Sequence, residues 1–151
     1  MSNHIWHPHV TVAALAFQDN QFLLVEEEIR ASIYLNQPAG HLEPGESLIE
    51  AVARECLEET GYHFRPTALV GIYQWALPAE DITYLRFSFA GDVLKHEPDR
   101  PLDHGIIAPR WLTLEAIRAS KERHRSPMVL RCVEDYLAGH RLPLTTITHY
   151  A

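Results

Sequence analysis

Residues 40–62 constrain this chain more than any other part of its sequence. They read GHLEPGESLIEAVARECLEETGY and are rich in glutamate. Ser47 and Glu50 form an S-x-x-E capping box and Gly61 supplies a stop, so a helix is expected over residues 48–60. Carboxylates crowded on one short helix repel one another unless a cation lies among them. A divalent metal ion is the natural candidate.

The expected helix gathers its carboxylates on one face. Glu55, Glu58 and Glu59 follow the spacing i, i+3, i+4, which places them side by side. They offer only oxygen ligands, a set that suits Mg²⁺ or Mn²⁺ better than zinc. Arg54 precedes Glu58 by four residues and can hydrogen-bond the acidic cluster and orient its members. Taken alone, such a helix is more often a solvated surface, but the glycine-proline loop before it favours the metal site.

The whole sequence predicts one α/β domain over residues 1–151, with a mixed sheet and helices packed on it. The expected strands cover residues 10–17, 22–25, 67–76, 82–93 and a short segment ending at Trp111-Leu112. Besides the acidic helix, whose apolar stripe is Leu48, Val52 and Cys56, helices are expected over 113–119 and from Ser126 to Gly139. Residues 26–35 are expected to end a strand and form a loop, 36–45 to be irregular, and 95–109 to form a surface loop.

Charge and composition argue against several classes of function. The net charge of −7 disfavours sequence-independent binding to the nucleic-acid backbone. An acidic protein that binds phosphates needs metal ions to screen the repulsion between the negative charges. Cys56 and Cys132 fall in helical patterns as apolar core residues, which favours a reducing compartment. The apolar run over residues 10–17 is too short to span a membrane. We expect a cytoplasmic protein that binds a small molecule, without nucleic acid, membrane or an obligate protein partner.

Residues 40–62 resemble the Nudix box, the motif G-x5-E-x7-R-E-U-x-E-E-x-G-U, in which U is a bulky apolar residue. The fixed positions are filled by Gly40, Glu46, Arg54, Glu55, Glu58, Glu59 and Gly61. Two U positions depart mildly, with Cys56 and Tyr62 where aliphatic residues are usual. Because so many fixed residues at set spacing rarely coincide, the chain is identified as similar to the Nudix hydrolases.

This resemblance implies a Nudix fold, an α/β arrangement with a mixed β-sheet sandwiched between α-helices. It also implies Mg²⁺-dependent hydrolysis, with Mn²⁺ as a substitute, of nucleoside diphosphates linked to another group. By the same resemblance, the catalytic set is Glu46, Arg54, Glu55, Glu58 and Glu59. Within it, Glu55, Glu58 and Glu59 would ligate metal together with the backbone carbonyl of Gly40. Arg54 and Glu46 would brace the helix and the ligands.

Segments outside the motif resemble one phosphatase branch of the family. They include HPHVTVA from residue 7, NQPAGHLE from residue 36, and Gln74-Trp75. That branch is associated with nucleoside tri- and diphosphates and with thiamine-type pyrophosphates, including hydroxymethylpyrimidine pyrophosphate. The alternatives are a Nudix pyrophosphatase for ADP-ribose or a damaged dNTP, and a non-catalytic Nudix module that only binds its ligand. Such modules typically lose carboxylates of the box, and this chain keeps them.

The group that accepts the proton from the attacking water is open at this stage. Crowding among Glu55, Glu58 and Glu59 raises the pKa of one of these carboxylates. Glu59 or Glu55 is therefore the first candidate for the general base. Many family members carry an additional glutamate in a loop before the tryptophan of the late strand. Here Asp103 lies near that position, and the connection between two strands offers Glu80 and Asp81. The base therefore need not belong to the box.

Five residues outside the box are candidates for contact with the substrate. Tyr73, Trp75 and Tyr84 lie on expected strands, where an aromatic ring either stacks on a base or belongs to the core. Arg86 lies within an otherwise apolar strand and either binds a phosphate or answers a buried acid. Arg30, in the expected loop after the second strand, is a weaker candidate for phosphate.

Overall fold

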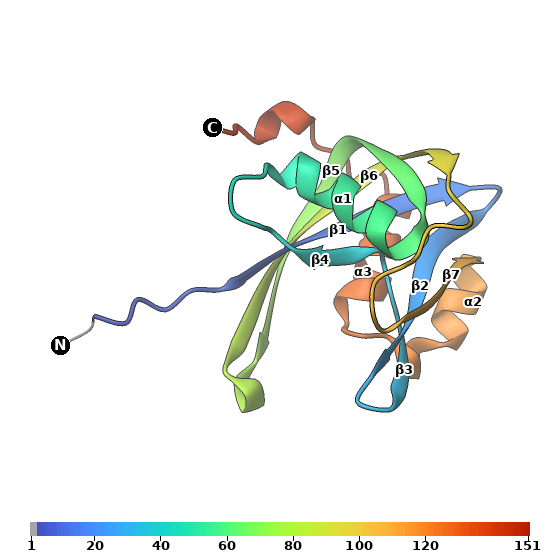
Figure 1. Cartoon of the computed structure of the whole chain (residues 1–151), viewed down its shortest axis with the longest axis horizontal. Helices are drawn as coiled ribbons and strands as arrows, with labels where there is room; N and C mark the ends of the chain where they lie inside the picture. The colour runs from blue at the N-terminus through green and yellow to red at the C-terminus, as the bar shows by residue number, and fades with distance from the viewer. Residues whose placement is uncertain (1–2) are drawn as a thin grey trace.

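The computed structural model describes residues 3–151, which fold around one seven-stranded sheet (Figure 1). The strands are β1 (His9–Gln18), β2 (Gln21–Ile29), β3 (Ser32–Asn36), β4 (Ala39–His41), β5 (Tyr62–Leu77), β6 (Ile82–His96) and β7 (Ile106–Leu112). The helices are α1 (Leu48–Thr60), α2 (Leu114–Ala119) and α3 (Met128–Leu137). Short 3-10 turns cover Pro78–Glu80, Lys121–Arg123 and Leu144–Thr146.

The sheet is mixed and carries helices on both faces. Its main path runs β3-β2-β1-β6-β5, with β4 paired to β1 and β7 paired to β2. Strands β1 and β6 are parallel, and the other pairs are antiparallel. This arrangement confirms the α/β fold class predicted from the sequence.

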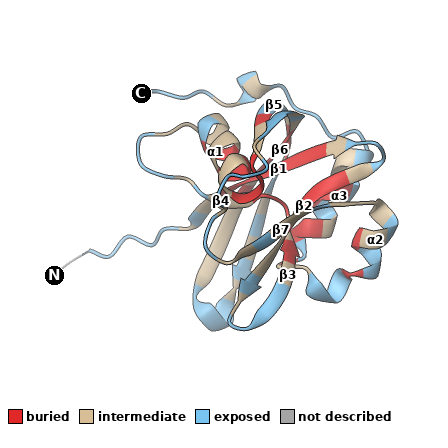
Figure 2. Ribbon diagram, turned by 45° about the vertical axis from the view of Figure 1, so that its right-hand side comes forward, coloured by how far each residue is buried: buried red, intermediate tan, exposed pale blue. Residues whose placement is uncertain are grey.

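Strand β1 separates two hydrophobic cores because its side chains alternate between the faces of the sheet. Val12 and Ala14 belong to the core that includes Val52 of α1, whereas Leu15 belongs to the core that includes Val129 of α3. The buried residues gather along these layers (Figure 2). Burial on both faces explains why residues 10–17 read as a nearly continuous apolar run.

Helix α1 has the limits that its capping residues predict. The Ser47 side chain accepts a hydrogen bond of 3.0 Å from the Glu50 backbone N–H. Gly61 adopts φ 75° and its N–H donates to the carbonyl of Leu57. A left-handed C-cap is conformationally cheap only for glycine. The acidic face of α1 is therefore held by local signals at both ends.

Three expected loops contain strands instead. Strand β2 continues to Ile29 and turns through Arg30 and Ala31, which have φ of 49° and 67°, into β3. Neither arginine nor alanine favours positive φ, so the sequence does not predict a turn between β2 and β3. The loop expected over residues 36–45 contains β4, which gains its order by pairing with β1. Strand β7 begins at Ile106, within the loop expected over 95–109.

Within residues 3–151, no helix combines the length and apolar character that crossing a bilayer requires.

Candidate active site

Arg54 is the centre of a hydrogen-bonded network on the acidic face of α1. Its Nε and Nη2 donate to the two carboxylate oxygens of Glu46 at 2.9 and 2.7 Å. Its Nη1 donates to Glu55 at 2.9 Å and to Glu58 at 3.1 Å. A further bond from Nη2 reaches the backbone carbonyl of His41 at 3.0 Å. One guanidinium thus ties the loop before α1, strand β4 and two carboxylates together, which is the bracing geometry expected of Arg54 and Glu46.

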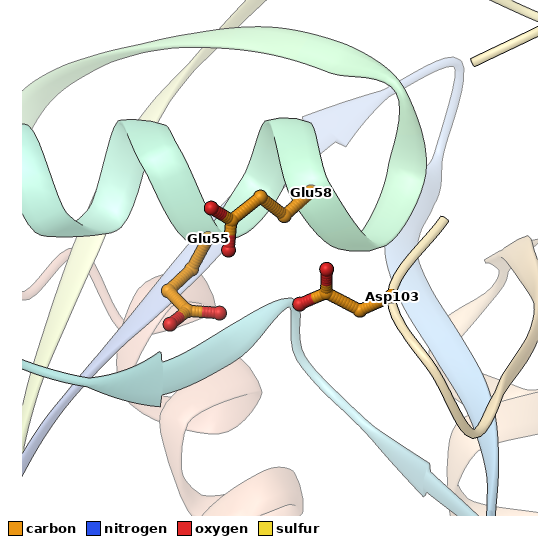
Figure 3. A group of neighbouring side chains, drawn as sticks. All are labelled: Glu55, Glu58 and Asp103. Atoms are coloured by element: carbon orange, nitrogen blue, oxygen red, sulfur yellow. The ribbon is translucent and has the colours of Figure 1, made fainter. Parts of the chain in front are cut away.

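Three carboxylates converge beside this network. Glu55, Glu58 and Asp103 each contribute an oxygen, and these atoms all lie within 4.8 Å of one another (Figure 3). Asp103 reaches the cluster from the loop between β6 and β7, where its backbone N–H donates to the carbonyl of Glu58 at 3.0 Å. A set of hard oxygen donors at this spacing fits Mg²⁺ or Mn²⁺. We call Glu55, Glu58 and Asp103 the acidic cluster.

The structure separates Asp103 from the other two acids considered outside the box. Glu80 and Asp81 occupy the tip of the β5–β6 hairpin, which projects away from α1 (Figure 1). The Glu80 carboxylate lies 3.9 Å from the Arg30 guanidinium. Hairpin geometry therefore carries Glu80 and Asp81 away from the acidic cluster, while the backbone bond to Glu58 holds Asp103 in it.

Glu59 points to strand β4 rather than into the acidic cluster. Its Oε1 accepts a hydrogen bond of 2.8 Å from the Ala39 backbone N–H, and its side chain is buried. The helical spacing places Glu59 on the same side of α1 as Glu55, but the free backbone donor of β4 draws its carboxylate away. Glu59 therefore joins the helix to the strand that contains Gly40.

Gly40 leaves room for the Glu55 carboxylate. A Cβ atom at this position would lie 2.2 Å from the carboxylate carbon of Glu55. No side chain fits there unless the carboxylate moves. The backbone of β4 thus approaches the Glu55 carboxylate closely.

The ionisation of the site follows from burial and from Arg54. Burial raises the pKa of Glu59 to about 9 and raises the pKa of Glu55, which Arg54 partly offsets. The hydrogen bond from Arg54 lowers the pKa of Glu46. Burial, followed by the nearby His9, lowers the pKa of His41. Desolvated carboxylates with raised pKa values gain most from a bound cation, which supports the metal assignment on chemical grounds.

A cavity of about 210 Å³ lies beside β4, which contains Gly40. Its lining consists of Thr11, Glu27, Ile29, Asn36, Ala39, Gly40, His41, Trp75, Tyr84, Arg86, Arg125, Ser126 and Met128. Three of the five residues expected to contact substrate, Trp75, Tyr84 and Arg86, are among them. We call this space the substrate cavity because it shares Gly40 with the metal-binding region.

The other two expected substrate residues lie elsewhere. The Tyr73 hydroxyl donates to Asp135 of α3 at 2.7 Å, and its ring packs against the core on that face of the sheet. Arg30 is exposed at the β2–β3 turn. Tyr73 and Trp75 lie on the same face of β5, opposite Arg86 and Tyr84 of β6. Tyr73 packs against the core below α3, whereas Trp75 lies two residues further along the strand and lines the cavity.

Among residues 3–151, no carboxylate forms an ion pair with the buried Arg86. Its side chain donates at 2.9 Å to Oε1 of Gln37 and at 2.8 Å to Oδ1 of Asn36, and the residue is only 4% exposed. Gln37 is itself fixed by donation to the carbonyl of Val129. Within residues 3–151, Arg86 Nε is a buried nitrogen without a hydrogen-bond partner. Both readings of Arg86, phosphate binding and pairing with a buried acid, stay predictions, since Arg86 forms no ion pair but its charge acts to lower the pKa of Glu27 in the same cavity.

Sequence reasoning missed Glu27, Asn36 and Gln37 as residues of this site. Asn36 and Gln37 belong to the NQPAGHLE segment, which was noted only as a resemblance. Glu27 lies in a stretch expected to be a loop and gave no local signal. In the structure, Asn36 and Gln37 accept hydrogen bonds from Arg86, and Glu27 lines the same cavity.

Both the sequence and the fold of this chain are similar to those of known proteins. The family model described as the NUDIX domain matches residues 7–132. The phosphatase NudJ of Escherichia coli strain K12 is 41% identical over 143 residues, which cover 95% of this chain and 92% of that protein. A NUDIX hydrolase from Nitrosomonas europaea superposes with a TM-score of 0.93 at 53% identity, covering 95% of this chain and 98% of the other. The MutT protein of Methanosarcina mazei Go1 superposes with a TM-score of 0.71 at 26% identity, covering 91% and 100%.

The chain belongs to the Nudix family of hydrolases. The match over most of its length confirms the resemblance drawn from residues 40–62, and the similarity to NudJ confirms the branch indicated by the flanking segments.

Proposed function

We propose that this protein hydrolyses phosphoanhydride bonds of nucleoside tri- and diphosphates, and of thiamine-type pyrophosphates such as hydroxymethylpyrimidine pyrophosphate, with Mg²⁺ or Mn²⁺ as cofactor. The acidic cluster of Glu55, Glu58 and Asp103, within 4.8 Å of one another beside the substrate cavity, carries the proposal. The similarity to the phosphatase NudJ supports the substrate class.

The residues of the chain divide the work between two regions. Glu55, Glu58 and Asp103, with the Gly40 carbonyl, would hold the divalent ions, and Arg54 would keep two of these carboxylates in place. Such ions, when bound, neutralise phosphate oxygens and lower the pKa of a coordinated water. In the substrate cavity, the positive charge of Arg86 would attract the anionic oxygens of the substrate.

Three carboxylates are candidates to accept the proton from water. Asp103 and Glu55 lie in the acidic cluster, within reach of the same space. Glu59 is held by the Ala39 N–H and would act only after rotating away from β4. The geometry therefore favours Asp103 or Glu55 over Glu59.

Hydrolysis should require the divalent cation. We expect phosphate or pyrophosphate release from a panel of nucleotides and thiamine-type pyrophosphates in millimolar Mg²⁺ or Mn²⁺, followed by ³¹P NMR to identify the bond that breaks. Excess EDTA should abolish release, and added Mg²⁺ should restore it. Absence of turnover on every phosphoanhydride in the panel with both metals would overturn the proposed function.

Substitution of Gly40 by alanine should separate activity from stability. The added Cβ would displace the flexible Glu55 carboxylate rather than backbone, so we expect kcat/KM to fall about 100-fold while the free energy of unfolding changes by less than ~1 kcal/mol. Steady-state kinetics and urea denaturation measure the two effects. Ala39→Gly, at the neighbouring residue of β4, is the control for a backbone change without a new side chain. Full activity of Gly40→Ala would show that the close approach to Glu55 is unimportant.

A further inference from the structure

Among the described residues, 3–151, Glu27 is the one carboxylate that lines the substrate cavity, and the proposed chemistry leaves it without a role. It lies on β2, opposite Tyr34 of β3, while its neighbour two residues back, Val25, pairs with Asn36. Glu27 and Asn36 are therefore diagonal neighbours on one face of the hairpin, and both line the cavity. The paired strands β2 and β3 hold the side chains of Glu27 and Asn36 side by side, so that both can contact a ligand bound in the cavity.

The half-buried Glu27 carboxylate accepts no hydrogen bond from residues 3–151. Burial raises its pKa, and the charges of Arg125 and Arg86 oppose that rise without cancelling it. Within the described residues 3–151, neither arginine comes within 4.0 Å of its oxygens to form an ion pair. A ligand N–H that donates to Glu27 would offset its desolvation.

Asn36 has the complementary capacity. A guanidinium can only donate, so the bond from Arg86 fixes the Asn36 side-chain oxygen toward the arginine. The Asn36 NH₂ group is left with its donors, and among residues 3–151 it forms no hydrogen bond. The edge of the cavity therefore offers an acceptor at Glu27 next to a donor at Asn36.

The remaining walls fit a flat ring. Trp75 and Tyr84 stack on each other at 17° with their centroids 5.8 Å apart, and both line the cavity. Aromatic side chains bind heterocycles by stacking without regard to their substituents. A volume of about 210 Å³ is sufficient for a six-membered ring, since a cavity of ~150 Å³ holds benzene. Stacking would supply affinity, and selectivity would come from the polar edge.

We propose that Glu27 and Asn36 select substrates whose organic group is a planar nitrogen heterocycle with an exocyclic amino group beside a ring nitrogen. The Glu27 carboxylate accepts a hydrogen bond from the amine, and the Asn36 amide donates to the ring nitrogen. An oxo ring of the same shape places its oxygen against the carboxylate and its N–H against the Asn36 donor, so it is rejected. This selectivity rests on the proposed function only in that the cavity holds the organic part of the substrate.

Cytidine and uridine monophosphates test the selectivity directly, because they differ at this edge and contain no phosphoanhydride bond. We expect calorimetric titration with Mg²⁺ present to show wild-type protein binding the cytidine nucleotide at least ~10-fold more tightly. Glu27→Gln, whose amide can both donate and accept, should bring the ratio near one. The matched control is Glu28→Gln, the same change at the next residue of β2, which is exposed and should keep the wild-type ratio.

Each other outcome overturns the proposal. An equal loss of affinity for both nucleotides in Glu27→Gln would assign Glu27 to the ribose hydroxyls. An unchanged ratio would remove Glu27 from recognition, and no binding of either nucleotide to the wild type would remove the ring from this cavity. Failure of the proposed hydrolysis would appear separately, as absent phosphate release in protein that still discriminates the two monophosphates.

Discussion

Replacing Glu55 by glutamine should lower kcat/KM by about 10³-fold or more and leave the protein folded. Glu55 is the carboxylate with the most ties to the site, since it belongs to the acidic cluster, accepts from Arg54 and packs against Gly40. The glutamine oxygen can still accept from Arg54, so the network persists. What the amide removes is the negative charge that the proposed metal ion would bind.

The stability of Glu55→Gln should equal or exceed that of the wild type in metal-free buffer. Burial and the neighbouring Glu58 and Asp103 all disfavour the ionised form of Glu55, so neutralising it relieves repulsion. Phosphate release over a Mg²⁺ titration, together with urea denaturation, measures both effects. Glu50→Gln, an exposed residue in the first turn of the same helix, should stay within about twofold of wild-type activity. Retention of more than a tenth of wild-type activity by Glu55→Gln would contradict its role as a ligand.

The part of the site that the sequence predicted is the part encoded locally. Caps at Ser47 and Gly61 fix the limits of α1, and fixed limits set which residues share its acidic face. The contacts of Arg54 with Glu46 and Glu58 follow from residues within one short segment. Such signals depend on helical geometry and need no knowledge of the rest of the fold.

The part that the sequence left open depends on contacts between distant segments. Arg86 donates a hydrogen bond to Gln37, which lies 49 residues away in the sequence, and no local pattern at either residue predicts this contact. The turn at Arg30 lacks the usual turn residues, so neither β3 nor the position of Glu27 in the cavity was predicted. Glu59 satisfies the spacing of a cluster member, but the backbone N–H of Ala39 redirects it. Periodicity gives the side of a helix on which a residue lies, and tertiary contacts decide where its side chain goes.

Removing the Arg54 side chain should produce the largest loss of stability among alanine substitutions of the charged residues of α1. Arg54→Ala deletes the bidentate bond to Glu46 and exposes Glu55 and Glu58 to each other's charge without compensation. Since the side chain is 21% exposed, we expect a loss of about 2–3 kcal/mol in the free energy of unfolding without metal. Arg65→Ala is the control, because its ion pair with Asp92 is exposed and should contribute less than ~0.5 kcal/mol.

Divalent cations should restore part of the stability that Arg54→Ala loses. An ion bound only by the folded state adds RT ln(1 + [L]/Kd), or about 2.7 kcal/mol at 100 times Kd. In the variant this ion supplies the positive charge that the guanidinium provided, so Mg²⁺ should raise its free energy of unfolding more than it raises that of the wild type. Arg54→Lys keeps the charge but not the planar fork, and should fall between the two. Equal Mg²⁺ effects in wild type and Arg54→Ala would mean that Arg54 and the cation do not neutralise the same carboxylates.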